Sequence, residues 1–297
     1  MKYLGVFVLI FSFSNGFTNN NYISSEPERQ TIVHNGIDRD FFVYLPDSYN
    51  PKKPTPLVLN FHGYGGTAYM FMYNTGFNDI ADKENFIVVH PQGTFLNERS
   101  HWNVGGSARG SKVDDYDFVR VLIEYLEGKY NIDSNRIYAA GMSNGGYFSL
   151  GLACQLSDKI AAIASVTGSM TPEMSKKCQT DKPIGILQLH GTKDAAVPYK
   201  GRQGWSLSIQ EVISFWTSKN GIQTRARVKA VPDIDKNDGS TVEKHTYSGG
   251  KNNTDVVHYK VIGGGHDWFG NRGNKDINAT KLIWDYFSKY TIEGKED

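Results

Sequence analysis

The sequence predicts an α/β fold in which helices cover both faces of a mainly parallel central sheet. Short, continuous apolar runs recur along the chain, as they do in strands that are buried on both faces. Amphipathic helical patterns lie between these runs, and strands that alternate with helices are typical of a parallel sheet. The apolar runs cover residues 57–61, 86–89, 137–140, 161–164, 184–189 and 256–261.

Antiparallel hairpins are expected at two places. Asn35-Gly36 separates apolar runs at 31–34 and 41–45, and Asn-Gly in this setting favours a two-residue turn at the N-terminal end of the fold. A second hairpin, on the surface, is expected over 228–247 around Asp238-Gly239.

Apolar residues at helical spacing predict three amphipathic helices. Their apolar positions lie within 119–126, 209–216 and 282–287. Asp114 or Asp115 can cap the first of these helices, and Gly221 can end the second. No linker divides the chain, so we expect one domain over residues 26–290.

The composition is that of a folded globular protein. Hydrophobic residues make up 39% and charged residues 21% of the 297 residues. The 32 basic and 31 acidic residues give a net charge of +1, which predicts no strong field of either sign. Nucleic acid is therefore not the expected partner.

The N-terminus has the pattern of a signal peptide over residues 1–16. Lys2 is followed by an apolar run at 3–13 that is too short to span a bilayer, and Ser14-Asn15-Gly16 supplies small residues for cleavage. The alternative is a buried N-terminal strand. No other stretch reaches the roughly 18 apolar residues of a transmembrane helix. We expect a secreted protein, extracellular or periplasmic, without a membrane anchor.

The most specific motif is Gly141-Met142-Ser143-Asn144-Gly145, which matches Gly-x-Ser-x-Gly. A predicted strand at 137–140 precedes it, and a predicted helix at 147–156 follows it. A serine at such a turn is held in a strained conformation with its hydroxyl exposed for attack. The helix N-terminus adds donors and positive potential for an oxyanion. Ser143 is therefore the expected nucleophile.

A serine hydroxyl is a weak nucleophile unless an imidazole takes its proton. His266 lies in the segment Gly-Gly-Gly-His-Asp-Trp at 263–268, directly after the last predicted strand. A glycine loop beyond one strand end can carry a histidine to a serine beyond another, because chemistry in such sheets lies at the carboxyl ends of strands. His266 is therefore the expected base.

The imidazole needs an acid that fixes its tautomer. Asp194 follows the predicted strand at 184–189 and is the expected acid. The competing carboxylates are Asp233, Asp235 and Asp267. The first two lie in the second hairpin, and the third is next to the base in sequence, so its carboxylate would point away. The order Ser143, Asp194, His266 is the order found in α/β-hydrolases.

An oxyanion hole needs two N–H donors aimed at the developing charge. The backbone N–H of Asn144, directly after the nucleophile, is the first expected donor. The second should come from the segment 62–66, His-Gly-Tyr-Gly-Gly, which follows the strand at 57–61. We assign it to Tyr64, with Gly63 as the alternative. His62 is expected to be structural.

Cys154 and Cys178 are the only two cysteines of the sequence. A secreted protein folds in an oxidising compartment, which favours one disulfide between them. The alternative is two buried free thiols.

Taken together, these segments resemble the polyhydroxybutyrate depolymerase and feruloyl esterase group of secreted, carbohydrate-esterase-1-like α/β-hydrolases. The resemblance extends from about residue 31 to residue 290. The motifs that carry it are 60–66, 90–93, 102–103, 114–115, 130–133, 141–146, 152–154, 190–194, 197–199 and 264–268. It implies a serine esterase with a triad of Ser143, Asp194 and His266, and it implies that Cys154 pairs with Cys178.

The chain departs from this family in two places. Many members have a second cysteine pair where this sequence has Gly105-Gly106-Ser107 and Ser248-Gly249-Gly250, so the segment near Trp102 must be held differently. After His266, members usually have Trp-Pro-Gly, whereas this chain has Trp268-Phe269-Gly270.

Substrate contacts are expected among aromatic residues that lie near the catalytic ones in sequence, namely Trp102, Tyr147 and Trp268. Aromatic walls would suit a feruloyl ring or the methyl-rich face of a polyester, and the alternative is that each ring packs in the core. The expected substrates are feruloyl or acetyl esters of plant polysaccharide, or short hydroxyalkanoate polyesters and their oligomers.

The sequence is also compatible with functions other than ester hydrolysis. A non-catalytic carbohydrate- or ligand-binding protein could use the same fold, although the complete serine, aspartate and histidine set argues against it. A peptidase or thioesterase is also compatible, since fold does not fix function. The sequence lacks the His-Glu-x-x-His and Cys-x-x-Cys metal motifs and the glycine signatures of nucleotide binding, so we expect no metal and no cofactor. A monomer is expected.

Overall fold

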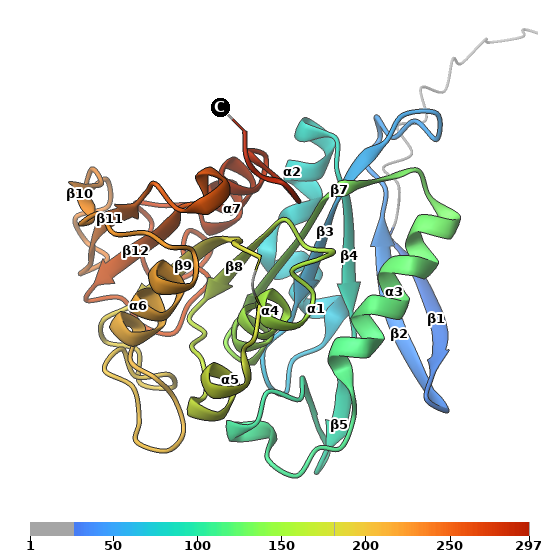
Figure 1. The fold of residues 1–297 in the computed structure, drawn as a ribbon, viewed down its shortest axis with the longest axis horizontal. Helices are drawn as coiled ribbons and strands as arrows, with labels where there is room; N and C mark the ends of the chain where they lie inside the picture. The colour runs from blue at the N-terminus through green and yellow to red at the C-terminus, as the bar shows by residue number, and fades with distance from the viewer. Residues whose placement is uncertain (1–26, 181, 297) are drawn as a thin grey trace, which may run out of the picture.

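The computed structural model describes residues 27–180 and 182–296, and its central feature is a ten-stranded sheet (Figure 1). The expected signal peptide at 1–16 lies outside the described residues. In spatial order, the strands are β1 (Glu28–His34), β2 (Ile37–Tyr44), β4 (Ile87–Pro91), β3 (Thr55–Phe61), β7 (Ile132–Met142), β8 (Ala162–Val166), β9 (Gly185–Gly191), β12 (Val256–Ile262), β11 (Thr241–Tyr247) and β10 (Arg227–Ala230).

The six central strands, from β4 to β12, run parallel, and antiparallel strands flank them on both sides. All seven residues of β3 and all seven of β9 are buried, as expected for strands covered on both faces. The carboxyl ends of the parallel strands therefore meet at one edge of the sheet. The prediction of a mainly parallel central sheet is confirmed.

Helices cover both faces of the sheet, as predicted. The helices are α1 (Ala68–Thr75), α2 (Phe77–Glu84), α3 (Asp115–Lys129), α4 (Asn144–Gln155), α5 (Pro172–Lys177), α6 (Ile209–Lys219) and α7 (Ala279–Phe287). Apolar side chains of α3, α4 and α6 pack in one cluster, and those of α1, α2 and α7 pack in another. Figure 1 shows α3, α4 and α6 in front of the sheet.

The N-terminal hairpin is confirmed. Strands β1 and β2 pair antiparallel, with His34 opposite Ile37. Between them, Asn35 and Gly36 have φ of 51° and 75°, the left-handed conformation that a two-residue hairpin turn requires.

The second hairpin is present as well. Strands β10 and β11 pair antiparallel and all of β10 is exposed, while β11 also pairs with β12, so the hairpin extends the main sheet at its edge. The connection between the two strands runs over 231–240 and includes Asp238-Gly239. Asp276 holds this connection, because its Oδ1 accepts the N–H groups of Ile234 at 2.7 Å and Asp235 at 3.1 Å.

The predicted helices begin and end close to their expected signals. Asp114 caps α3 by accepting the N–H of Asp117 at 3.0 Å. Helix α6 ends at Lys219, two residues before Gly221, whose φ is 72°.

Helices α1, α2 and α5 were not predicted. Gly76 divides α1 from α2 with a left-handed φ of 66°, and two eight-residue helices are too short for a clear periodicity.

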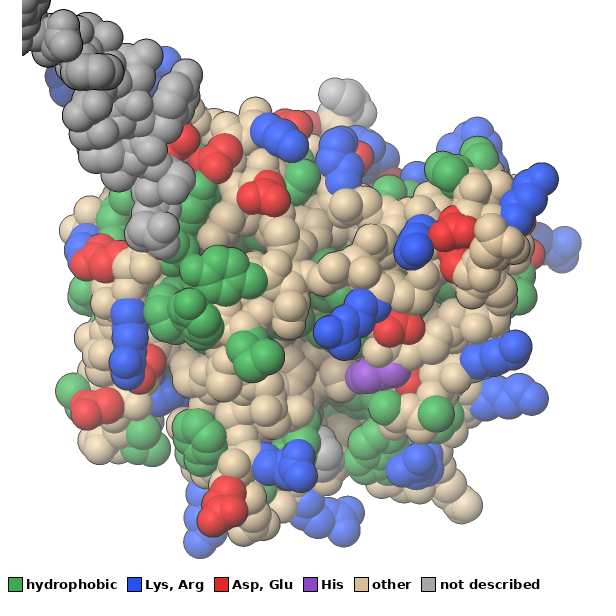
Figure 2. Space-filling model, turned by 180° about the vertical axis from the view of Figure 1, so that it is seen from behind, with side chains coloured by type: hydrophobic (Ala, Val, Ile, Leu, Met, Phe, Trp, Pro, Cys, Tyr) green, Lys and Arg blue, Asp and Glu red, His purple; other side chains and the backbone are tan. Residues whose placement is uncertain are grey.

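The face opposite to that of Figure 1 carries basic and acidic side chains interspersed with apolar groups, without a large area of one sign (Figure 2). This agrees with the net charge of +1. Among the residues that the structure describes, none of the helices is both long enough and apolar enough to cross a membrane.

Candidate active site

Ser143 lies at a sharp turn between β7 and α4. Its φ of 55° and ψ of −121° are strained for a residue with a side chain. The neighbouring glycines are needed for space, because a Cβ on Gly145 would lie 2.1 Å from the carbonyl oxygen of Phe61. A Cβ on Gly141 would lie 2.4 Å from the carbonyl oxygen of Gly145. The turn therefore has the form of a nucleophile elbow.

His266 and Asp194 are in direct contact. The His266 Nδ1–H donates to Asp194 Oδ2 at 2.7 Å, and the other carboxylate oxygen accepts the N–H groups of Ala196 and Val197 at 2.9 and 2.8 Å. Burial alone would raise the pKa of Asp194, but hydrogen bonds from His190 and His266 hold it well below its usual range. The carboxylate is thus ionised and fixed, as an acid that orients an imidazole must be.

The loops that carry Asp194 and His266 are tied together beyond the adjacent strands β9 and β12. The N–H of Lys193 donates to the carbonyl oxygen of Gly264 at 2.9 Å, and that of Gly263 donates to Thr192 Oγ1 at 2.9 Å. The chains pass so close at Gly191 that a Cβ there would lie 2.3 Å from the carbonyl oxygen of Gly264. These contacts fix the position of His266 relative to Asp194.

Ser143 and the residues that follow Asp194 line the same small pocket. The pocket has a volume of about 120 Å³, and its lining includes Asn144, Ala196 and Val197. Among the contacts of the described residues, Ser143 Oγ makes no hydrogen bond to His266. Such bonds are often long in the free form of an enzyme and tighten when substrate is bound.

The two expected oxyanion donors lie beside Ser143. A Cβ on Gly63 would lie 3.4 Å from Ser143 Cβ, so the segment 62–66 passes directly next to the nucleophile. Asn144 is the first residue of α4, where a backbone N–H has no partner within its helix. Tyr64 lines the same pocket as Ser143, with 37% of its surface exposed.

His62 is a structural residue. Burial lowers its pKa to about 4, so the ring is neutral at pH 7. Its Nδ1–H donates to the carbonyl oxygen of Gly63 at 2.8 Å, and its Nε2 accepts the N–H of Gly93 at 3.0 Å. The ring therefore fixes the start of the segment that leads to Tyr64.

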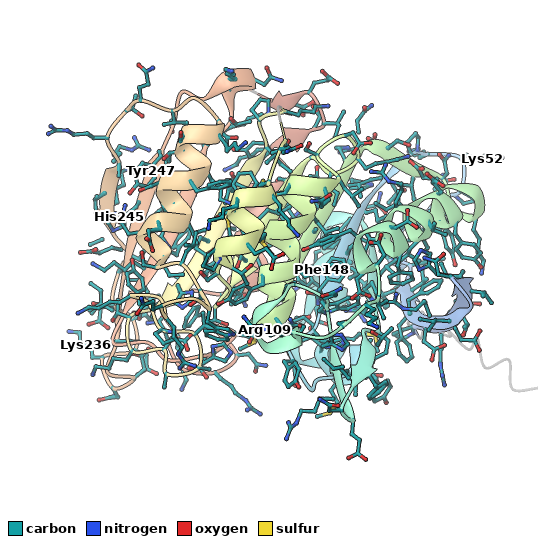
Figure 3. The ribbon with its side chains drawn as sticks, turned by 60° about the horizontal axis from the view of Figure 1, so that its bottom comes forward. Lys52, Arg109, Phe148, Lys236, His245 and Tyr247 are labelled. Atoms are coloured by element: carbon teal, nitrogen blue, oxygen red, sulfur yellow. A yellow bond between two sulfur atoms is a disulfide. The ribbon has the colours of Figure 1, made fainter. Side chains whose placement is uncertain are left out.

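Two of the three expected substrate contacts are wrong. Trp102 has no exposed surface and stacks, at 4.9 Å between ring centres, on Phe148 of α4, which Figure 3 labels. Trp268 is 5% exposed, donates through Nε1 to Thr280 Oγ1 at 2.9 Å and packs with α1 and α2. Of the three residues expected to contact substrate, Tyr147 alone lines the pocket of Ser143.

Two residues of the site were not predicted from the sequence to have a role in it. His190 is fully buried beneath Asp194; its Nε2 lies 2.8 Å from the carbonyl oxygen of Val197 and 3.3 Å from Asp194 Oδ2. Trp205 lines the pocket of Ser143 although it lies in no motif. His190 begins the segment 190–194 that carries the resemblance, but nothing in the sequence indicated that its ring lies against Asp194.

The segment near Trp102 contains no cysteine. A buried ion pair between Arg39 and Asp115 holds it instead. Asp115 accepts the N–H of Asn103 at 2.8 Å and the guanidinium of Arg39 at 2.7 Å. Burial raises the pKa of Asp115, whereas Arg39 opposes that rise. The Arg39 guanidinium also lies 3.7 Å from the ring centre of Phe118.

Cys154 and Cys178 form a disulfide, as expected, with their Cα atoms 5.0 Å apart. The bond joins α4 to the end of α5. In the part of the chain that the structure describes, no three His, Cys, Asp or Glu side chains gather in a way that could hold a metal ion.

These features define an α/β protein with a serine at a nucleophile elbow and a histidine–aspartate pair at neighbouring strand ends. The family model described as "Putative esterase" matches residues 34–268, and the chain belongs to this esterase family.

Curated relatives support this membership. The bifunctional acetylxylan esterase/xylanase XynS20E of Neocallimastix patriciarum is 28% identical over 259 residues, 87% of this chain and 34% of the relative. Feruloyl esterase B of Piromyces equi is 29% identical over 257 residues, 86% of this chain and 46% of the relative. The chain thus spans 34% and 46% of the lengths of these two relatives.

Solved structures show the same fold. An acetyl xylan esterase from Aspergillus awamori superposes with a TM-score of 0.63 at 14% identity, covering 88% of this chain and 99% of its own. A ferulic acid esterase from Anaeromyces mucronatus gives a TM-score of 0.57 at 16% identity, covering 88% of this chain and 90% of its own. The predicted α/β-hydrolase fold is confirmed.

Proposed function

We propose that the chain is a serine carboxylic-ester hydrolase that acts through a covalent acyl-enzyme on Ser143. The observation that carries this proposal is the 2.7 Å hydrogen bond between His266 and Asp194, at the edge of the sheet where the Ser143 turn also projects. Membership of the esterase family supports the same chemistry.

In the proposed mechanism, Ser143 Oγ attacks the acyl carbonyl while His266 Nε2 accepts its proton. The tetrahedral intermediate collapses, and the alcohol leaves with the proton from His266. Water, deprotonated by His266, then hydrolyses the acyl-enzyme and releases the acid. Asp194 stays ionised and stabilises the imidazolium in both half-reactions.

The negative charge of the tetrahedral intermediate is proposed to be held by the backbone N–H groups of Asn144 and Tyr64. Each such donor lowers the barrier by about 3 kcal/mol, because it is already oriented before charge develops. Placement of Asn144 at the N-terminus of α4 adds the positive end of the helix dipole.

We propose feruloyl or acetyl esters of plant polysaccharide as the substrate class. Support comes from the relatives described above, which include an acetylxylan esterase/xylanase and a feruloyl esterase. The pocket of about 120 Å³ is comparable with the cavity of about 150 Å³ that holds benzene in another protein, so an acetyl group or one aromatic ring would fit. Tyr64, Tyr147 and Trp205 supply aromatic surface around it.

The test is the initial rate of hydrolysis of methyl ferulate, acetylated xylan and short 3-hydroxybutyrate oligomers, with Ser143→Ala as the blank. We expect turnover of the first two, reduced about 10⁴-fold or more in the blank. A preference for the oligomers would favour a polyester substrate instead. Absence of turnover in a folded protein would favour the non-catalytic binding protein.

We also propose that the protein is secreted after removal of residues 1–16. The disulfide between Cys154 and Cys178 supports this, since such bonds persist in oxidising compartments. N-terminal sequencing of the protein recovered from a secreting host tests the cleavage. An intact Met1 on the exported protein would contradict it.

A further inference from the structure

A second, larger cavity adjoins the pocket of Ser143. Its volume is about 730 Å³, within the range of ligand sites, compared with about 120 Å³ for the pocket. The residues that line both are Val104, Gly105, Gly106, Thr171 and Trp205. A substrate whose acyl group occupies the pocket could therefore continue across these residues into the cavity.

Trp205 lies where the two cavities meet. The guanidinium of Arg202 lies 4.8 Å from its ring centre. Its indole edge rests on Gly106, where a Cβ would lie 2.8 Å from Trp205 Nε1. The half-buried ring thus offers a fixed apolar surface, of the kind on which the apolar face of a sugar ring packs.

The charged lining of the larger cavity is mainly basic. Arg109, Lys176 and Lys177 line it together with a single carboxylate, Glu173. Glu173 Oε1 lies 2.7 Å from Lys177 Nζ, so these two charges largely cancel. Arg109 and Lys176 are exposed and remain as an excess of positive charge that a ligand in the cavity would meet.

The wall that carries the two lysines is fixed covalently. Helix α5 has only six residues, and none of them is buried. Thr171 caps it, and the disulfide from Cys178 to Cys154 joins its end to α4. The disulfide, the Thr171 cap and partly buried Met174, which packs against the core, together restrain the position of Lys176 and Lys177.

We propose that this cavity binds the alcohol side of the ester, and that this side is a polysaccharide chain that carries carboxylates, such as uronic acid residues. The inference rests on the proposed ester hydrolysis at Ser143. The cavity supplies the volume, Trp205 supplies a ring for stacking, and Arg109 and Lys176 supply charge for the carboxylates. A neutral polyester would use none of this charge.

The test compares two acetylated xylan oligosaccharides of equal length, one with and one without a glucuronic acid branch. The preference is the ratio of the two kcat/KM values. We expect the wild type to prefer the acidic oligosaccharide. Replacing both basic residues, Arg109→Gln with Lys176→Gln, should lower the preference about 5- to 10-fold, mainly through KM, as two exposed charge pairs allow.

A matched control is Lys52→Gln, which removes one exposed positive charge far from Arg109 (Figure 3). We expect the preference of this variant to equal that of the wild type. About 0.5 M salt should also reduce the wild-type preference, since exposed charges are screened. Equal rates on the two oligosaccharides in the wild type, or an unchanged preference in the double variant, would overturn the inference.

Binding to Ser143→Ala separates this inference from the proposed function. Calorimetry with the glucuronic acid oligosaccharide should show binding that the two Gln substitutions weaken. Such binding without any ester hydrolysis by the wild type would leave the cavity assignment standing and reject the hydrolase. Ester hydrolysis with no binding difference would reject the cavity assignment and leave the hydrolase standing.

Discussion

Trp102 and Asn144 exchange two hydrogen bonds across the core. The backbone N–H of Trp102 donates to Asn144 Oδ1 at 2.7 Å, and Asn144 Nδ2 donates to the carbonyl oxygen of Trp102 at 3.1 Å. The indole N–H of Trp102 also donates to the carbonyl oxygen of His62 at 3.0 Å. One buried tryptophan therefore fixes both segments that are proposed to supply oxyanion donors, at Asn144 and at Tyr64.

The Asn144→Ala substitution should damage both stability and turnover. It keeps the backbone N–H at position 144 but leaves the buried N–H of Trp102 without its partner, at about 1–3 kcal/mol. The Trp102 carbonyl loses one of two hydrogen bonds and still accepts the N–H of Val104 at 2.9 Å. A shift of the donor by a fraction of an ångström would then lower kcat about 10- to 100-fold with little change in KM. Denaturant unfolding and steady-state kinetics measure the two effects.

Ser149→Ala is the control for Asn144→Ala. Ser149 is also buried in α4, and its Oγ donates to the carbonyl oxygen of Gly145 at 3.0 Å. This bond lies within one helix and holds no second segment, so kcat should change less than about threefold. A similar loss of kcat in both variants would mean that α4 is merely destabilised.

The Asp194→Asn substitution tests the acid. The amide can still accept the N–H groups of Ala196 and Val197, but it can no longer stabilise a charged His266. We expect kcat to fall about 10³- to 10⁴-fold with a small change in stability. Asp267→Asn, next to the base, is the control and should keep most activity. If Asp267→Asn were the inactive variant, the assignment of the acid would be wrong.

Stability should decline between pH 6.5 and pH 4. Burial lowers the pKa of His62 to about 4 and those of His90 and His258 to about 3. The unfolded chain binds these protons near pH 6.5 and the folded chain does not, so stability is complete above pH 6.5 and is lost as the pH falls. Near pH 5, three such groups give a slope of about 4 kcal/mol per pH unit.

Urea unfolding at a series of pH values measures this slope. A free energy of unfolding that stays constant from pH 7 to pH 5 would contradict the neutral, buried state of the three histidines.

Removing the disulfide should lower the free energy of unfolding by about 3 kcal/mol. Cys154 and Cys178 are 24 residues apart, and closing a loop of that size restricts the unfolded chain by roughly this amount. The double substitution Cys154→Ala with Cys178→Ala tests this by denaturant unfolding. Reduction of the wild type should produce the same shift and should not affect the double variant further.

The sequence was most informative where the chemistry is local. The glycines around Ser143 are there because the chain crosses itself at that turn, and such close crossings leave a pattern within five residues. Asp194 and His266 each follow a buried strand, so the parallel fold alone brings them to one edge. Helices α1 and α2, which Gly76 separates, could not be predicted in this way because eight residues are too few to show a helical periodicity.

Contacts between distant segments could not be predicted in the same way. Trp102 is near catalytic motifs in sequence, but its role depends on Asn144, which is 42 residues further along the chain. An aromatic residue in a core and one in a pocket look alike in a single sequence. Trp205 shows the converse case, because it reaches the pocket from a loop without any motif.

The two edge strands of the sheet affect whether copies of the molecule associate. Within the part of the chain that the structure describes, β1 and β10 are the two edge strands of the sheet (Figure 1), and each pairs with a neighbouring strand on one side. All four residues of β10 are exposed, including Arg227 and Lys229, and β1 exposes Glu28 and Arg29. Two β10 strands that met edge to edge would bring like charges together. Crowded molecules should therefore remain separate, and the sedimentation coefficient should stay constant as concentration rises.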